Sequence, residues 1–138
     1  MARTDVTPQG LTVYRDEWHM SPGIISGGLL WLTGMTGHRP EDNSFADDPE
    51  VQIREAFEKV EAVLVEAGLT SEDMVEMTSY HVDLQGHIDV FQEVRDEFVR
   101  EPNPAWTAIE VSGFVTPGAI VELRVVADAS GLPRPAQA

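Results

Sequence analysis

The sequence predicts an α+β domain in which two helices cover one face of a single mixed sheet. Two observations support this fold class. Apolar residues recur at helical spacing in two segments, and they alternate with polar residues in the segments around them. The resulting order is strands, helix, strand, helix and two strands. With 138 residues the chain is long enough to bury one core, and we take residues 1–138 as a single domain.

The first candidate strands lie in the N-terminal part of the chain. Residues 11–14 form a short candidate strand. Residues 29–33 are almost continuously apolar and are bounded by glycines, which is typical of a strand buried on both faces, so Trp31 is expected in the core. Residues 1–9 and 131–138 are expected to be flexible tails.

Two later segments have the period of amphipathic helices. In the first, Asp48 suits the N-cap, Pro49 suits the first helical position, and Gly68 suits the stop. Its apolar residues share one face: Ile53, Ala56, Phe57, Val60, Val63, Leu64 and Ala67. The second helix is expected over residues 88–100, and a strand over residues 75–84 connects the two.

The last two strands are expected over residues 105–112 and 119–127, paired as a hairpin through a turn that contains Thr116-Pro117-Gly118. Alternation places one set of side chains of the second strand on the helix-covered face: Val121, Leu123, Val125 and Ala127. The uncovered face then receives Ile120, Glu122, Arg124 and Val126, with Trp106, Ala108 and Glu110 from the first strand. An exposed face with a tryptophan and aliphatic residues tends to mark an interface, so we expect an oligomer.

The composition restricts the classes of partner. The formal net charge is −15, from 24 acidic and 9 basic residues. Such a surface repels phosphate groups, so we expect neither nucleic acid nor a membrane as partner. No apolar run approaches a membrane span and no signal core opens the chain, so a cytoplasmic location is expected. The absence of cysteine excludes disulfides and thiolate sites.

Several motifs, taken in order, resemble the RidA (YjgF/YER057c/UK114) family over roughly residues 20–128. Residues 30–35 are similar to the family's Val-Phe-Val-Ser-Gly-Gln segment, the helix over 57–69 to its NLKAVLEAAG helix, and residues 75–84 to its VVKTTVFLTDM strand. The chain then closes with Pro-Ala-x-Thr, Glu-Val and Val-Glu-Leu. The resemblance implies a chorismate-mutase-like α+β fold and a homotrimer with three small-molecule clefts between its subunits.

The resemblance also implies which residues form the site. Glu122 matches the family's glutamate that helps to position water, and it is the candidate catalytic residue. Thr33 and Gly34 match the Ser-Gly pair whose backbone faces the ligand. Met20 stands near the position of the tyrosine in the family's Tyr-Ser-Gln segment, and Ala108 stands for its small residue or cysteine.

Trp106 occupies the position at which the family's enamine/imine deaminases have an arginine that holds the substrate carboxylate. An indole has one N–H donor and no charge, whereas a guanidinium binds a carboxylate through two charge-assisted hydrogen bonds. Loss of the charged partner costs a carboxylate ligand on the order of 3–5 kcal/mol, which argues against the standard deamination of 2-aminoacrylate. Arg124 either presents a cation to the cleft or pairs with Glu122 or Glu110 across the hairpin, and we favour the pairing.

Other polar clusters carry less information. His81, Asp83, His87 and Asp89 have the composition of a metal site, but their spacing matches no standard one, and we interpret them as solvated turn and helix-start residues. No Ser/His/Asp triad stands out. We therefore expect neither a metal nor a cofactor.

Three hypotheses for function follow. The first is a RidA-like trimer that binds a small metabolite, neutral or aromatic, and in which Glu122 activates water to hydrolyse an imine or enamine bond. The second is a non-catalytic binding or regulatory trimer. The third is the ribonuclease activity ascribed to some family members, against which the acidic charge counts.

Overall fold

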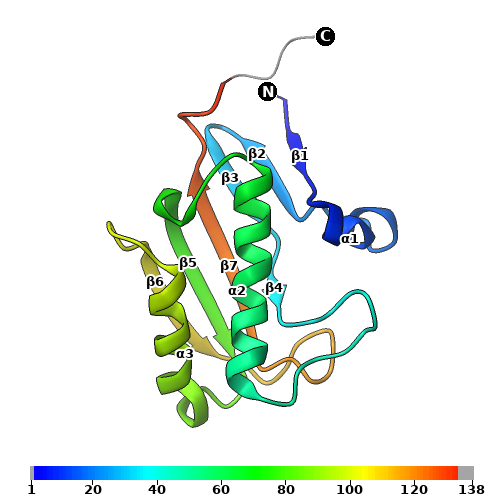
Figure 1. The fold of residues 1–138 in the computed structure, drawn as a ribbon, viewed down its shortest axis with the longest axis vertical. Helices are drawn as coiled ribbons and strands as arrows, with labels where there is room; N and C mark the ends of the chain where they lie inside the picture. The colour runs from blue at the N-terminus through cyan, green and yellow to red at the C-terminus, as the bar shows by residue number, and fades with distance from the viewer. Residues whose placement is uncertain (1, 134–138) are drawn as a thin grey trace.

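The structure, a computed structural model, describes residues 2–133 and contains one mixed sheet of seven strands (Figure 1). Six strands follow the order β1-β2-β3-β7-β5-β6, and β4 also pairs with β7. Every pair is antiparallel except β5 with β6. The predicted α+β class is confirmed. The strands are β1 (Thr4–Val6), β2 (Gly23–Ser26), β3 (Leu29–Leu32), β4 (Met35–Thr36), β5 (Met74–His81), β6 (Ala105–Glu110) and β7 (Val121–Asp128).

Both long helices, α2 (Pro49–Glu66) and α3 (Leu84–Phe98), cover the same face of the sheet, as predicted (Figure 1). The predicted N-cap of α2 is confirmed, because the Asp48 carboxylate accepts a hydrogen bond from the Glu50 N–H at 2.9 Å. α3 begins four residues earlier than predicted, where the Glu110 carboxylate accepts the Leu84 N–H at 3.0 Å. The shorter helical elements are η1 (Gln9–Leu11), α1 (Thr12–Asp16) and η2 (Ser71–Asp73).

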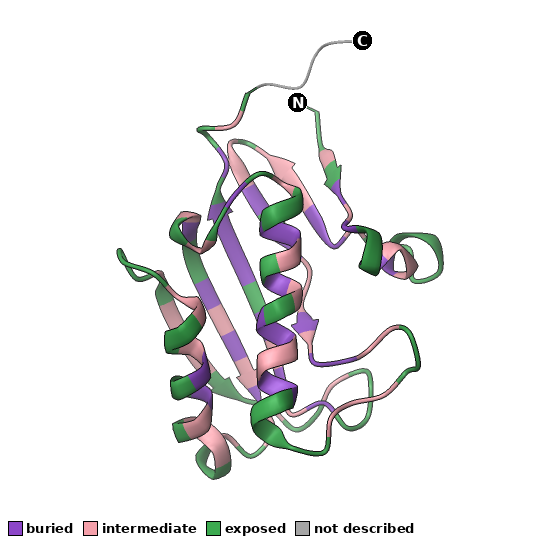
Figure 2. Cartoon of the chain, viewed as in Figure 1, coloured by how far each residue is buried: buried purple, intermediate pink, exposed green. Residues whose placement is uncertain are grey.

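The core lies between the two helices and the sheet (Figure 2). Ile53 and Phe57 of α2 are at most 2% exposed, and so are Val121, Leu123 and Val125 of β7. Full burial of one such side chain contributes about 1.5–3 kcal/mol, so this layer stabilises the fold substantially. The predicted placement of alternate β7 residues on the helix-covered face is confirmed.

The predicted hairpin between the last two strands is wrong. β5 separates them: it pairs in parallel with β6 and antiparallel with β7. The chain passes from β5 through α3 to β6, and such a crossover returns the chain parallel to its first strand. Side chains of paired residues point to the same side, and Trp106 pairs with the fully buried Met77. Trp106, and with it Ala108 and Glu110, therefore belongs to the helix-covered side, not to the uncovered face.

Other predictions for individual segments are also wrong. Residues 11–14 are helical, and Thr4–Val6 forms an edge strand rather than part of a loose lead. Burial alternates along β3, and Trp31 is 40% exposed instead of lying in the core. Ile120, predicted on the uncovered face, packs against the core.

Most of the predicted C-terminal tail falls on residues 134–138, which lie outside the described residues.

The uncovered face of the sheet carries a mixture of apolar and charged side chains. Glu122 pairs with Tyr80, which pairs in turn with Ile109, so these three form one row across the sheet. Arg124 lies two residues after Glu122 on the same face. Trp31 and Ile109 remain 40% and 43% exposed. This face combines the large apolar groups and the charges that a protein interface contains.

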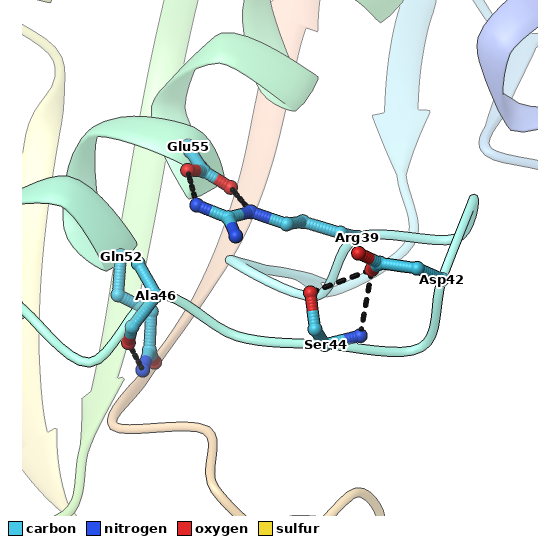
Figure 3. A network of polar contacts seen from close by, with 6 residues as sticks. All are labelled: Arg39, Asp42, Ser44, Ala46, Gln52 and Glu55. Carbon is cyan, nitrogen blue, oxygen red and sulfur yellow. Dashed lines mark hydrogen bonds and ion pairs between the residues drawn. The ribbon is translucent and has the colours of Figure 1, made fainter.

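Gln52 of α2 is only 3% exposed and fixes two loops at once. Its side-chain N–H groups donate to the carbonyls of Ala46 at 3.3 Å and Gly118 at 3.2 Å, and its carbonyl oxygen accepts the Ile120 N–H at 2.7 Å. Figure 3 shows the bond to Ala46. Because Ile120 directly precedes β7, this amide determines where the central strand begins.

The loop between β4 and α2 is also held to the helix (Figure 3). The Arg39 guanidinium donates two hydrogen bonds to the Glu55 carboxylate, at 2.6 and 2.8 Å. Within the loop, the Asp42 carboxylate accepts bonds from the hydroxyl and the N–H of Ser44. A two-pronged arginine–carboxylate pair limits both distance and orientation, so the loop has a defined place beside the sheet.

We expect Gln52→Ala to lower the free energy of unfolding by about 2–4 kcal/mol, because it leaves three backbone groups without partners. Urea unfolding measures this change. Glu61→Ala, at an exposed position of the same helix, is the control and should change stability by less than about 0.5 kcal/mol. Equal losses in the two variants would contradict this account of Gln52.

Candidate functional site

A pocket of about 550 Å³ opens beside the start of β7. Its apolar lining consists of Tyr14, Trp18, Met20, Phe114 and Val115. Its polar lining consists of Thr33, Gly34, Thr36, His38, Asn43, Thr116 and Glu122. Within residues 2–133 this lining includes no arginine or lysine, and Glu122 supplies its carboxylate. A small, uncharged molecule with an apolar body fits such a lining.

Glu122 extends from β7 on the uncovered face of the sheet into this pocket. A Cβ atom at Gly34 would lie 2.6 Å from its Oε2, so the glycine leaves the space in which the carboxylate sits. Burial raises the pKa of Glu122, and the positive charge of Lys59 opposes this shift. A carboxylate with a raised pKa is a stronger base than a fully solvated one, which suits it to accept a proton from water.

Tyr14, which lines the pocket, and Lys59, which bonds to it, form a second polar element that the sequence patterns did not identify. Tyr14, in α1, is 3% exposed, and its hydroxyl accepts a hydrogen bond from the Lys59 ammonium of α2 at 2.7 Å. Burial, followed by the charge of Glu122, raises the pKa of Tyr14 to about 12. Burial lowers the pKa of Lys59 to about 8. Both groups therefore keep their protons at neutral pH.

The sequence contained one indication of this pair. Lys59 is the only lysine among 138 residues, and it stands beside the apolar stripe of the predicted helix. Tyr14, by contrast, lay in a segment predicted as a strand. Because 45 positions separate the two residues, only the packing of α1 against α2 brings them together.

The structure brings some of the predicted site residues together and separates others. Met20, Thr33 and Gly34 line the pocket with Glu122, and the Thr33 hydroxyl lies 3.8 Å from the Met20 sulfur. Ala108 lies in β6, which does not contribute to the pocket. The ligand-binding roles of these residues remain predictions.

Trp106 lies on the opposite face of the sheet from Glu122. Its indole N–H donates to the Ser79 hydroxyl at 2.8 Å, and its ring stacks on Phe91 with centroids 5.9 Å apart. The Arg95 guanidinium lies 4.4 Å from the ring centroid, in the geometry of a cation–π contact. Within one chain Trp106 therefore packs between β6 and α3 and does not reach the pocket.

Arg124 is exposed on the same face as Glu122, as predicted. Its favoured pairing with Glu122 or Glu110 is absent: within the described part of the chain, neither carboxylate forms a salt bridge with it. For Glu110 the missing hairpin explains this, because β5 separates the two residues and Glu110 holds the start of α3, whereas Glu122 extends into the pocket. Arg124 does not line the pocket of this chain.

His81 is fully buried, so the interpretation of it as a solvated turn residue is wrong. Its Nε2 lies 2.8 Å from the Ser79 hydroxyl, and burial lowers its pKa to about 4. Across residues 2–133, no three histidine, aspartate or glutamate side chains gather in a way that could hold a metal ion. In that same range, no helix is both long and apolar enough to cross a membrane.

Comparison with known protein families gives a match over most of the chain. Residues 16–129 match the family described as "Endoribonuclease L-PSP". The RutC family protein YjgH of Escherichia coli (strain K12) is 36% identical over 126 residues, which cover 91% of this chain and 94% of that protein.

Solved structures show the same similarity. A structure of protein YjgH superimposes with a TM-score of 0.84 at 34% identity, covering 99% of this chain and 100% of the other. A YjgF/YER057c/UK114 protein of Mycobacterium tuberculosis gives 0.76 at 26% identity, covering 92% and 99% of the two chains. RidA from the Antarctic bacterium Psychrobacter sp. PAMC 21119 gives 0.75 at 25% identity, covering 91% and 95%.

We expect Gly34→Ala to displace the Glu122 carboxylate while leaving the fold intact, because the three atoms nearest the new methyl group all belong to that flexible side chain. Moved toward solvent, Glu122 should show a pKa closer to its ordinary value, which carboxyl-labelled NMR titration measures. Gly113→Ala is the matched control, since a Cβ there meets nothing within 4 Å. An unchanged Glu122 pKa in Gly34→Ala would contradict the close packing of these residues.

We expect Lys59→Met to stabilise the protein at neutral pH. The pKa of Lys59 is about 8 in the folded chain and 10.5 for an ordinary lysine, so the cost of the buried ammonium is fully present below pH 8. Between pH 8 and pH 10.5, Lys59 keeps its proton in the unfolded chain but has lost it in the folded one. The cost therefore disappears as the pH rises through this range. The variant should therefore gain on the order of 1–3 kcal/mol near pH 7 and progressively less toward pH 10.

Urea unfolding of both proteins at several pH values tests this prediction. Arg3→Met, which removes an exposed cation, is the control and should show no comparable gain. A loss of stability in Lys59→Met, or a gain that is independent of pH, would show that the ammonium is not buried at a cost.

Proposed function

This chain belongs to the RidA/YjgF/L-PSP family, and on that premise we propose that it binds a small neutral metabolite and hydrolyses an imine or enamine bond within it. The observation that supports the reaction is the half-buried carboxylate of Glu122, packed on Gly34 in a largely apolar pocket. Substrate, water and base can meet there without the competition of bulk solvent.

The proposed role of Glu122 is to orient a water molecule and accept its proton as the oxygen attacks the C=N carbon. Its raised pKa lets the carboxyl return this proton to the leaving nitrogen. The backbone at Gly34 approaches the carboxylate closely because no side chain intervenes. A single acid–base group at this position can serve both halves of an imine hydrolysis.

The proposed substrate is neutral because the pocket offers a carboxylate ligand no positive partner. The described lining includes no arginine or lysine, and Glu122 would repel a second carboxylate. Trp106 stands where the resemblance places a carboxylate-binding arginine, and its indole cannot replace that charge. The standard substrate of the family's deaminases therefore fits this chain poorly.

We also propose that the protein acts as a homotrimer with its sites between subunits. Exposed Trp31 and Ile109 on the uncovered face support an assembly that buries them. Trp106 and Glu122 lie on opposite faces of one sheet, so a single cleft contains both residues only when they come from different copies. Arg124, exposed beside Glu122, would then meet a neighbouring copy as well.

A non-catalytic binding protein is the alternative, and the same apolar pocket supports it. It predicts a retained metabolite that native mass spectrometry of the purified protein would detect. A ribonuclease role is less consistent with the chain, because the net charge of −15 repels a phosphate backbone.

The release of ammonia from freshly generated imines, both with and without a carboxylate, tests the hydrolase proposal. We expect turnover of neutral imines, and we expect Glu122→Gln to lower kcat by about 100-fold or more without loss of folding. Glu76→Gln removes an exposed carboxylate outside the pocket and should keep the wild-type rate. Absence of turnover for every imine would reject the hydrolase, and an unaffected Glu122→Gln rate would reject the role of this residue.

A further inference from the structure

Two ionisable groups, Tyr14 and Glu122, line the pocket, and a third, Lys59, contacts the Tyr14 hydroxyl from outside the lining. Tyr14 comes from α1, Lys59 from α2 and Glu122 from β7. Their charges influence one another. The negative charge of Glu122 raises the pKa of Tyr14 and partly offsets the lowering of the Lys59 pKa by burial, and the positive charge of Lys59 lowers the pKa of Glu122. The only lysine of the chain thus lies within electrostatic reach of the candidate catalytic carboxylate and forms its hydrogen bond with Tyr14.

The hydrogen bonds of Tyr14 leave one proton free. A lysine ammonium has three N–H donors and no acceptor, so the 2.7 Å contact requires that Lys59 donates and the Tyr14 oxygen accepts. The hydroxyl proton of Tyr14 must then be directed elsewhere. Among residues 2–133 it has no protein acceptor, and Tyr14 lines the pocket that Glu122 also lines.

We propose that Tyr14 is the proton donor of this site, facing the ligand together with Glu122, and that Lys59 is a positioning residue that polarises the Tyr14 hydroxyl. The pocket then offers one donor and one acceptor. This pairing selects a ligand whose basic nitrogen or oxygen takes the Tyr14 proton. The inference rests on the proposed imine hydrolysis and specifies its second acid–base group.

The proton transfers balance without another reactant. As water attacks the C=N carbon, Glu122 takes a proton from the water and Tyr14 gives one to the nitrogen, forming a carbinolamine. Protonated Glu122 then returns its proton to the nitrogen, and the C–N bond breaks to release ammonia. The carbinolamine O–H gives its proton to the Tyr14 phenolate as the C=O bond forms. Lys59 stabilises the phenolate between these steps through its positive charge.

The arrangement has a cost that a purely structural contact does not explain. Burial penalises the Lys59 ammonium, and methionine would fill similar space without a charge. Charged or titratable groups around Lys59 come from several elements: Tyr14 from α1, Glu122 from β7, His38, Arg39 and Glu41 from the loop before α2, and Glu55 and Glu58 from α2 itself.

One test needs no substrate. Protein labelled with ¹³C-lysine gives a single Cε resonance, because the chain has one lysine, and its titration reports the pKa of Lys59 directly. We expect Glu122→Gln to lower this pKa, since the glutamate charge favours the ammonium. Glu76→Gln should leave it unchanged. An unchanged Lys59 titration in Glu122→Gln would overturn the inference, because the lysine would then be uncoupled from the pocket.

The second test uses the hydrolysis of neutral imines. We expect Tyr14→Phe to lower kcat by about 100-fold and Lys59→Met by at least about tenfold, with the double variant no slower than Tyr14→Phe. Wild-type kcat should fall as the pH rises through about 8, where Lys59 loses its proton, and Lys59→Met should lack this decline. Arg3→Met is the control for removal of a cation, and thermal unfolding verifies that each variant is folded.

The outcomes separate the two proposals. A wild-type protein that hydrolyses no imine overturns the proposed function itself. An active wild type whose Tyr14→Phe and Lys59→Met variants keep the full rate and the same pH profile overturns this inference alone.

Discussion

The central strand β7 is the constraint on which the rest of the structure depends. It pairs with β3, β4 and β5, so it joins the N-terminal strands to the strand–helix–strand unit of β5, α3 and β6. Its side chains alternate between two environments. Val121, Leu123 and Val125 complete the core under the helices, and Glu122 enters the pocket on the other face. The buried Gln52 amide of α2 fixes Ile120, the residue before β7. It therefore determines where α2 lies along this strand.

Periodicity predicted most of the helices and strands, but not which strands pair with each other in the sheet. The apolar stripe and the Asp48 cap identified α2, and alternation assigned the two faces of β7 correctly. The same alternation could not show that β5 lies between β6 and β7, because a strand pattern is the same for parallel and antiparallel neighbours. That one error of pairing moved Trp106 to the wrong face of the sheet.

The candidate site was predictable where its residues stand in motifs that resemble those of the family. Gly34 and Glu122 were identified from the resemblance, and β4 brings them together on β7. Tyr14 and Lys59 were missed because their contact depends on the packing of two helices that are far apart in the chain. The pocket takes its donor from α1 and its acceptor from β7, and α2 supplies the lysine behind the donor, so the site exists only once the sheet and helices have assembled.

The proposed reaction requires a neutral ligand to bind between Tyr14 and Glu122. A crystal structure of the protein with a stable neutral amide, which mimics an imine and its water adduct, tests this claim most directly. We expect the amide to lie beside the Glu122 carboxylate and to accept a hydrogen bond from the Tyr14 hydroxyl. An amide bound elsewhere, or a pocket closed by its own side chains in the presence of saturating ligand, would contradict it.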